Sequence, residues 1–486
     1  MPGSDSRDRS APSPSGEGRG GVGAHCRQRA PKSALVLTAL LAACAPTPFP
    51  GGERELVGRD LGDLDALQSR TLDRLSSAGA AAPAEALPDG TSPDDYVRLA
   101  LAHSPELAAA RQRVLRLRER IPQVTAPPDP MVEVTPIGEM ARTAAGEVTV
   151  MTGVSQAIPY PGKLDALGRV ADQESVIAGR ELREREVEVA GEVRRAYWSL
   201  YAAERALELT AAARDLLAQI HAATEAQYRA GQGRLQDVLL AGVEVAETDS
   251  RLVELRADRA AAAAMLNSLA DRPTDASAPV VSSAEPASIG AAFDALAADA
   301  AGANPRLAAI RERIELARRQ RHVAHLQRYP DLVASVSYNL VDADREMPTA
   351  TGDDQWSIGV GVSIPLWRGK LAAAEREATR GILEAAGELA AEQNRIAFRL
   401  RESLARLASQ QEQATLLRDS IIPQARAALD ASRAAYRTGA SEFITTVDNW
   451  RRVLTLELMR ERLVADTHAA AASIAEAVGR DPETKP

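Results

Sequence analysis

The chain is poor in cysteine and in aromatic side chains. Its 486 residues include only Cys26 and Cys44, and Phe, Trp and Tyr together make up 3% of the sequence. If the segment before Cys44 is removed, the remaining cysteine has no disulfide partner. The scarcity of aromatic residues, with alanine abundant, favours long and closely packed helices over a large globular core.

Motifs for catalysis and for nucleic-acid binding are missing as well. The net charge is −9, so no basic footprint for nucleic acid is present. The sequence has neither a Gly-Lys-Ser/Thr phosphate loop nor a His-Glu-x-x-His metal motif. His322 and His325 stand three residues apart on a predicted helix, a spacing more typical of an ordinary polar face than of a metal site. We therefore expect neither an enzyme nor a cofactor.

A long hydrophobic run is also lacking. The apolar segment 34–43 follows Arg27, Arg29 and Lys32 and is too short to span a membrane as a helix. It ends in Leu-Ala-Ala-Cys, which resembles a bacterial lipobox, so Cys44 is expected to carry a covalent lipid at the mature N-terminus. A free cysteine in an ordinary signal segment is the alternative. Residues 1–43 are interpreted as the signal segment. Its true translation start could lie at a later position within these residues.

The most informative feature present is an internal repeat. Gly162-Lys163 recurs as Gly369-Lys370, offset by 207, and Tyr228 to Gly231 recurs as Tyr436 to Gly439, offset by 208. Ser104-Pro105 recurs as Asn304-Pro305. A period near 200 is too long for a solenoid and indicates a duplicated domain. The predicted divisions are a lipidated linker (44–92), a first repeat (93–271), a connecting segment (272–303), a second repeat (304–479) and a tail (480–486).

Each repeat contains two segments that alternate with a period of two. Residues 355–364 place large side chains at even positions and small or polar ones at odd positions. Residues 332–340 repeat this pattern, and 148–158 and 131–135 supply the other two predicted strands. The polar stretches 137–146 and 342–354 are expected to be hairpin loops. One face would carry Val336, Tyr338, Trp356, Ile358, Val360 and Val362.

Two such hairpins make a poor soluble sandwich, because two-stranded ribbons are marginal alone. Their length is near the 9–11 residues that cross a bilayer, and the alternation is that of a barrel with lipid outside and water inside. Lipid forbids an open sheet edge, so other copies of the chain must complete the barrel. Two copies give eight strands and a filled interior, whereas three give twelve and a lumen. We favour a trimer.

The rest of the mature chain is predicted to be helical. Residues 163–230 contain no proline and form a helix of roughly 100 Å. Residues 370–437 repeat it, with a kink expected at Pro423. Shorter helices near 234–269 and 441–478 return along the long ones, and helices near 93–121 and 304–328 pack beside them. The turns at Gly231 and Gly439 lie at the far tips.

Taken together, these motifs resemble those of the TolC-like outer-membrane efflux protein family over nearly all of 93–479. The Pro128-Asp129-Pro130-Met131 and Pro159-Tyr160-Pro161-Gly162-Lys163 stretches are most similar to the branch that serves heavy-metal efflux pumps. The resemblance implies a fold that is mainly α with a small β part. It implies a trimeric twelve-stranded transmembrane β-barrel continued by a long periplasmic α-helical barrel.

The resemblance also implies residues for a gate at the periplasmic tip. Asp237 and Tyr436 match positions linked between neighbouring helices to hold the tunnel shut, close to Arg229. Asp448 matches one of two acidic positions at the constriction, but Thr445 occupies the other. This departure weakens the case for a cation-binding ring, and Asp448 is alternatively a solvated carboxylate on a helix face.

These expectations combine into one function. The chain would be a lipid-anchored exit duct in the outer membrane of a Gram-negative bacterium, with its helices in the periplasm. It would act passively as a homotrimer with a periplasmic adaptor and an inner-membrane pump of the resistance–nodulation–division type. Its cargo would be heavy-metal cations or drugs. The alternative from another class is a periplasmic adaptor lipoprotein with a coiled-coil hairpin.

Overall fold

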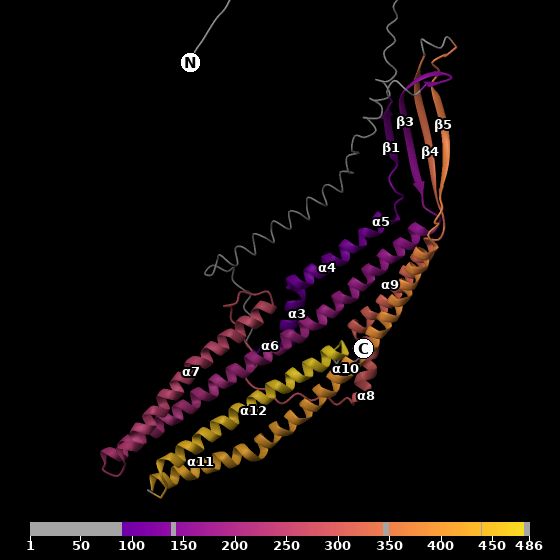
Figure 1. Cartoon of the computed structure of the whole chain (residues 1–486). Coiled ribbons are helices and arrows are strands. Elements are labelled where there is room, and N and C mark those ends of the chain that lie inside the picture. Colours follow the sequence, from indigo (N-terminus) through magenta and orange to yellow (C-terminus); the bar gives the residue numbers. More distant parts are fainter. Residues whose placement is uncertain (1–89, 138–141, 344–348, 439, 481–486) are drawn as a thin grey trace, which may run out of the picture. The chain divides into compact units, whose positions relative to one another are not determined.

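The computed structural model describes residues 90–137, 142–343, 349–438 and 440–480 (Figure 1). Cys44 and Gly439 lie outside these residues. None of the described helices combines the length and the apolar character that are needed to cross a bilayer. The chain divides into two units, the smaller of which includes 142–149, 340–343 and 349–354. The larger unit contains the helices and most of the sheet.

The first repeat begins with three short helices rather than the single helix predicted over 93–121. These are α3 (Pro93–His103), α4 (Pro105–Arg118) and α5 (Arg120–Thr125). The break falls at Ser104, because a residue before proline is driven out of the α region, and Ser104 has ψ of 121°. The Ser104 hydroxyl accepts a hydrogen bond from the Leu107 N–H and so caps α4. Ser104-Pro105 is therefore a helix boundary.

The two long helices of the first repeat agree with the prediction. α6 (Lys163–Arg229) runs for 67 residues and α7 (Leu235–Leu269) returns along it. The buried face of α6 includes Val193, Tyr197 and Leu200, each 0% exposed, as their helical spacing predicted. A helix this long gains its stability mainly by packing an apolar stripe against neighbours.

The second repeat contains a helix that was not predicted. α8 (Phe293–Ala303) lies within the stretch expected to be a connecting segment, and α9 (Pro305–Leu326) follows it across the Asn304 cap. The pair matches α3 and α4 of the first repeat. The long helix consists of α10 (Arg368–Leu416), a π-helical turn η1 (Leu417–Ile421) and α11 (Ile422–Arg437), before α12 (Phe443–Val478). The expected interruption at Pro423 thus takes the form of a π turn that ends two residues before it.

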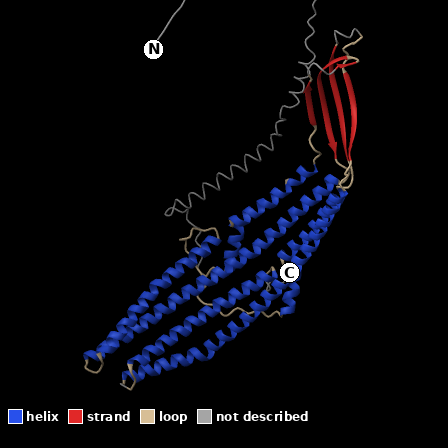
Figure 2. Cartoon of the chain, in the orientation of Figure 1, coloured by secondary structure: helices blue, strands red, loops and turns tan. Residues whose placement is uncertain are grey.

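The strands form one sheet with the order β1-β3-β4-β5 (Figure 2). They are β1 (Met131–Pro136), β3 (Gly146–Ile158), β4 (Asp331–Asp342) and β5 (Gln355–Ser363), and a short β2 (Arg142–Thr143) pairs with β3. β2 falls in the stretch predicted to be a loop. The two predicted hairpins, β1/β3 and β4/β5, are antiparallel and join through β3 and β4. A mainly helical, duplicated fold with a small sheet is therefore confirmed.

The smaller unit holds close turns that glycine makes possible. The Gly352 N–H donates to the Ala145 carbonyl at 2.8 Å, and the Val341 N–H donates to the Asp354 carboxylate at 3.2 Å. Gly146 has φ of 138°, and a Cβ there would lie 2.1 Å from the Asp342 carbonyl oxygen. No other residue fits at position 146 without moving the chain.

Candidate functional site

The register of the sheet sorts its side chains onto two different faces. On β4 and β5, Val336 pairs with Ile358 and Tyr338 pairs with Trp356. Cross-strand partners share a face, so large apolar side chains are collected on one side. All of the predicted lipid-facing residues lie there and are exposed in the single chain: Val336, Tyr338, Trp356, Ile358, Val360 and Val362. Val132 and Val154 form such a pair in the other hairpin.

The opposite face is small and polar. Ser337 and Ser357 are cross-strand partners whose hydroxyl oxygens lie 2.8 Å apart. Ser335 stands opposite Gly359, where an added Cβ would lie 2.6 Å from the Ser335 hydroxyl oxygen. A side chain at Gly359 would therefore require the Ser335 hydroxyl to move, and the polar face suits contact with water.

A partly buried ion pair connects this sheet to α6. The Lys163 ammonium lies 2.8 Å from the Asp331 carboxylate and donates a second bond to the Tyr329 carbonyl at 2.9 Å. The same carboxylate accepts from the Tyr160 N–H at 2.7 Å. The Tyr160 and Tyr329 rings stack with centroids 4.5 Å apart. Lys163 is 7% exposed, although its counterpart Lys370 is exposed.

The turn between α6 and α7 depends on glycine. Gly231 has φ of 72°, in the left-handed region, and its N–H donates to the Tyr228 carbonyl at 3.0 Å. The next N–H, of Gln232, donates to the Gln227 carbonyl at 2.9 Å. The predicted tip residue Arg229 is exposed and pairs with Glu225 one turn before it.

Asp237 and Tyr436 come together at the tip, from α7 and α11. Both line a cavity of about 670 Å³ between the two tip turns. The Tyr436 ring packs on Phe443, with centroids 5.3 Å apart, and its hydroxyl is buried without a hydrogen bond among the described residues. Burial raises the pKa of Tyr436, Thr224 lowers it, and the nearby Asp237 carboxylate raises it further. The two residues are neighbours, and both Asp237 and Thr224 lie close enough to influence the Tyr436 hydroxyl, although no hydrogen bond of good geometry joins it to either of them in the single chain.

Asp448 has a cationic neighbour, which the sequence reading did not include. Its carboxylate is exposed and lies 3.7 Å from Arg451 one turn further along α12. Arg451 also holds Glu244 of α7 through two bonds, one of 3.0 Å from Nε. Glu244 is buried, so this pair ties α7 to α12. Thr445 is exposed, as Asp448 is.

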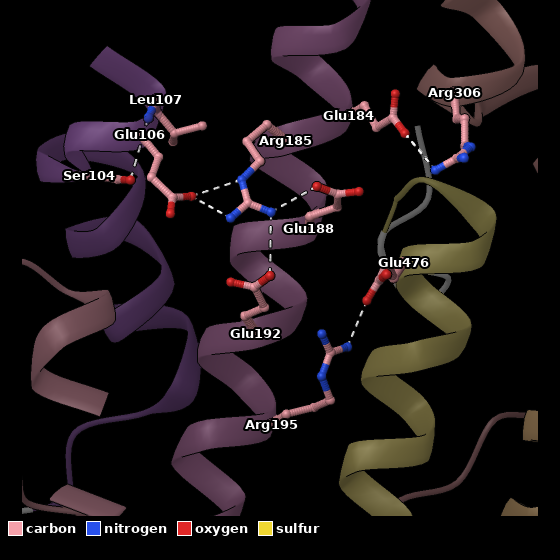
Figure 3. A network of polar contacts seen from close by, with 10 residues as sticks. All are labelled: Ser104, Glu106, Leu107, Glu184, Arg185, Glu188, Glu192, Arg195, Arg306 and Glu476. Carbon is pink, nitrogen blue, oxygen red and sulfur yellow. Dashed lines mark hydrogen bonds and ion pairs between the residues drawn. The ribbon is translucent and has the colours of Figure 1, made fainter. Parts of the chain in front are cut away.

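A layer of ion pairs holds the upper part of the bundle together (Figure 3). Arg185 of α6 reaches Glu106 of α4 at 2.9 Å and Glu188 at 2.9 Å. Arg195 pairs with Glu476 of α12 at 2.6 Å. Three helices, α4, α6 and α12, are thus connected by charge, in addition to their apolar contacts. Glu106 directly follows Ser104-Pro105, where α3 ends and α4 begins, so one short stretch supplies both the helix boundary and an ion-pair partner for α6.

The segment from 278 to 289, here the crossing segment, runs between α7 and α8 across several helices. Its Val281 N–H donates to the Tyr197 hydroxyl at 2.9 Å, and its Ala287 N–H donates to Thr467 at 3.0 Å. Glu285 places its carbonyl 3.0 Å from the His468 ring nitrogen and its carboxylate 3.0 Å from Arg418 in the π turn. The crossing segment therefore connects the first repeat with the second.

Within the part of the chain that the structure describes, no group of three or more His, Cys, Asp and Glu side chains is placed to hold a metal ion. His325 lies 3.9 Å from Glu375, as part of an exposed group with Arg321 and Arg328.

Comparison with family models matches the Outer membrane efflux protein family over residues 96–271 and 296–480. The two matched stretches correspond to the two structural repeats. A search of curated protein sequences found no significant match.

Solved structures with the same fold include outer-membrane proteins and channels. The outer membrane protein VceC of Vibrio cholerae is 18% identical, with a TM-score of 0.66 over 80% of this chain and 97% of that one. The CmeC outer membrane channel of Campylobacter jejuni is 13% identical, with a TM-score of 0.64 over 84% and 92%. CusC, studied for transmembrane channel formation, is 15% identical, with a TM-score of 0.65 over 83% and 96%. At these identities the likeness establishes the fold.

Proposed function

The chain belongs to the outer membrane efflux protein family, and from this premise we propose that it is the passive exit duct of a tripartite efflux system. It would receive substrates from an inner-membrane pump and a periplasmic adaptor and conduct them to the exterior. The family match favours the duct over the adaptor considered from the sequence.

The observation that carries this proposal is a two-faced sheet with unpaired edges. Its order β1-β3-β4-β5 leaves β1 and β5 with one neighbour each among the described strands. Backbone groups on such edges cannot be left without partners in hydrocarbon. Three copies joined edge to edge would give a twelve-stranded barrel, with the Val360 face toward lipid and the Ser357 face toward a water-filled lumen.

Cys44 would add a lipid anchor to this assembly. The Leu-Ala-Ala-Cys sequence and the lack of any other thiol after it support this role. A single acyl chain binds a membrane only marginally, so an anchor would act together with the inserted strands.

The tip would provide the closed state. Asp237 and Tyr436 face one cavity, and the Tyr436 hydroxyl is buried without a hydrogen bond in the single chain. A buried donor without a partner costs about 1–3 kcal/mol, so a carboxylate that accepted its proton in the closed assembly would be favoured. Adaptor binding would then release the latch by stabilising a dilated state.

The pump would be of the resistance–nodulation–division type, and heavy-metal cations would be the first cargo to test. The Pro-Asp-Pro-Met and Pro-Tyr-Pro-Gly-Lys stretches support this choice. At the constriction, Asp448 would stand close to Arg451, so any cation site there would be weaker than a ring of unpaired carboxylates.

The decisive experiment is reconstitution of the purified protein in planar bilayers. We expect trimers in the outer-membrane fraction and discrete conductance steps that increase when adaptor is added. A protein that stays in the soluble periplasmic fraction, or never conducts, would refute the duct.

A further inference from the structure

Three helix ends adjoin the same end of the sheet. α5 ends at Thr125 shortly before β1, α9 ends at Leu326 shortly before β4, and α10 begins at Arg368 shortly after β5. The register places the beginning of β4 opposite the end of β5, and the beginning of β1 opposite Ser155 near the end of β3. The three helix ends therefore meet the strands at one level (Figure 1).

Basic residues are concentrated at these helix ends, here called the basic collar (116–125, 317–328 and 368–380). The three ranges contain three, four and four basic residues against one, none and two acidic residues, a net charge of +8. The whole chain carries −9, so the sign of the charge is reversed at this level of the molecule. A local excess of one sign attracts ligands of the opposite sign.

Few carboxylates of the chain neutralise the collar. Arg321 and Arg328 share one carboxylate, that of Glu375, and His325 lies beside it as well. Other guanidinium groups of the collar are exposed and make no ion pair with another described residue: Arg118, Arg368 and Arg376. Most of the positive charge is therefore available to a ligand outside the chain.

An apolar strip lies directly beside these cations. Ile364 continues the row of large side chains that begins with Trp356 on β5, and it is 66% exposed. Leu366 and Trp367 follow at 72% and 78% exposed, immediately before Arg368. Tryptophan favours the boundary between hydrocarbon and water, and arginine can lay its stem on hydrocarbon while its charged end reaches the headgroups.

The corresponding stretch of the first repeat has neither feature. Residues 163–173 contain two basic and two acidic residues, and Lys163 is buried in an ion pair inside the chain. Tyr160, the counterpart of Trp367 at an offset of 207, stacks on Tyr329. The exposed apolar strip and the free cations beside it are therefore not a by-product of the internal repeat.

We propose that the basic collar binds the anionic phospholipid headgroups of the leaflet around the helical end of the barrel, with Leu366 and Trp367 inserted at the level of the first acyl carbons. The inference deepens the proposed function and rests on its membrane-inserted barrel. Arginine suits this ligand, because a planar guanidinium can donate to two phosphate oxygens at once. The adjoining apolar strip favours a phospholipid over a soluble anion, which would leave that strip in water.

The association of lipid with the full-length trimer tests the collar. The purified protein is reconstituted into phosphatidylcholine bilayers, with spin-labelled phosphatidylglycerol or spin-labelled phosphatidylcholine as the probe. The fraction of label that the protein immobilises gives the relative association constant of the two lipids. We expect a preference of about three-fold or more for phosphatidylglycerol at low salt, and its loss near 1 M salt, where the screening length falls to about 3 Å.

Matched charge variants locate the preference. The collar variant combines Arg118→Gln, Arg368→Gln and Arg376→Gln, and we expect it to lower the preference by about half or more. The control removes the same charge from exposed arginines of α7 and α12 that also make no ion pair with a described residue: Arg256→Gln, Arg452→Gln and Arg462→Gln. It should keep the preference of the parent protein. Trimer yield in detergent shows whether each variant assembles.

The outcomes separate the collar from the duct. A protein that conducts but binds the two lipids equally would overturn the collar and leave the duct intact. An equal loss in the control would assign the preference to net charge and overturn the collar too. A collar variant that forms no trimers in detergent would assign these arginines to contacts between copies, and competition by millimolar glycerol phosphate would assign them to a soluble anion. Either result overturns the proposal. A protein that never inserts would contradict both the collar and the duct.

Discussion

The Lys163 ammonium lies 2.8 Å from the Asp331 carboxylate, and the pair joins the first residue of α6 to the first residue of β4. The two residues are 168 positions apart, in different repeats. This contact is placed where the long helices meet the sheet. It therefore helps to fix the angle at which the wall of a tunnel would continue the wall of a barrel.

Breaking this pair should destabilise the assembled protein. Asp331→Asn leaves a buried ammonium without its counter-charge, and we expect a loss of roughly 1–3 kcal/mol per chain, discounted because the Asp331 side chain is 38% exposed. Lys163→Met should cost less, since the remaining carboxylate reaches water. The readout is the temperature at which trimers dissociate. Lys370→Met, at the exposed counterpart, is the control, and an equal loss there would argue against a specific pair.

The two faces of the sheet should respond differently to the same charge. Val360→Arg places a cation on the face proposed to contact lipid, at a cost of roughly 2–4 kcal/mol near the bilayer midplane. Ser357→Arg, on the other face, should assemble in higher yield and reduce conductance. Trimer yield in the outer-membrane fraction gives the comparison. Equal yields would show that the faces have been assigned incorrectly.

Loss of the latch should open the tip. We expect Asp237→Ala combined with Tyr436→Phe to raise the single-channel conductance and to increase the entry of antibiotics. Tyr436→Phe alone should leave the folded chain as stable or slightly more so, because the hydroxyl it removes is buried without a hydrogen bond in the single chain. An assembled double variant with normal conductance would rule these two residues out as the latch.

His468 should make the crossing segment sensitive to acid. Its ring stacks on Trp198 with centroids 3.6 Å apart, and burial lowers the pKa of His468 below its ordinary 6.5, although the bond to the Glu285 carbonyl opposes this. Below about pH 6.5 the unfolded chain therefore binds more protons than the folded chain, and stability falls until the pH passes the folded pKa. His468→Phe keeps an aromatic ring without a titrating group. Its melting temperature should fall less than that of the parent protein between about pH 7 and pH 5.

The anchor prediction concerns the N-terminal segment outside the described residues. Cys44→Ser should abolish incorporation of labelled fatty acid and cleavage before residue 44, because the sequence has no later cysteine. Assembly need not be lost, since the strands supply their own attachment. Label that persists in the variant would exclude the lipobox.

Strands and helices whose apolar residues repeat at a short, regular spacing could be predicted from the sequence. The alternation at 355–364 defined both strand and faces, and the register of β5 against β4 agrees with it. The long helices followed from the absence of proline in 163–230. The break at Ser104 was missed because a helical pattern is present on both sides of Pro105 and was taken to be one continuous helix.

Contacts between distant residues could not be predicted in this way. Lys163 and Lys370 occupy the same motif, yet only Lys163 is buried, because Asp331 is close to it. Likewise, the positions of Glu244 and Arg451 in the sequence do not predict the ion pair by which they join α7 to α12. α8 was missed because its short, alanine-rich sequence carries too few large apolar residues for a clear stripe.

The π turn explains a discrepancy of one residue between the repeats. From Lys163 to Tyr228 the first repeat counts one residue fewer than the second does from Lys370 to Tyr436, since the offset grows from 207 to 208. A π turn holds one residue more than the α-helical turn it replaces. Leu417–Ile421 thus absorbs a single-residue insertion, and both ends of the long helix keep the phase of their counterparts in α6. Without such a turn, one added residue would rotate every side chain that follows it by about 100° around the helix axis.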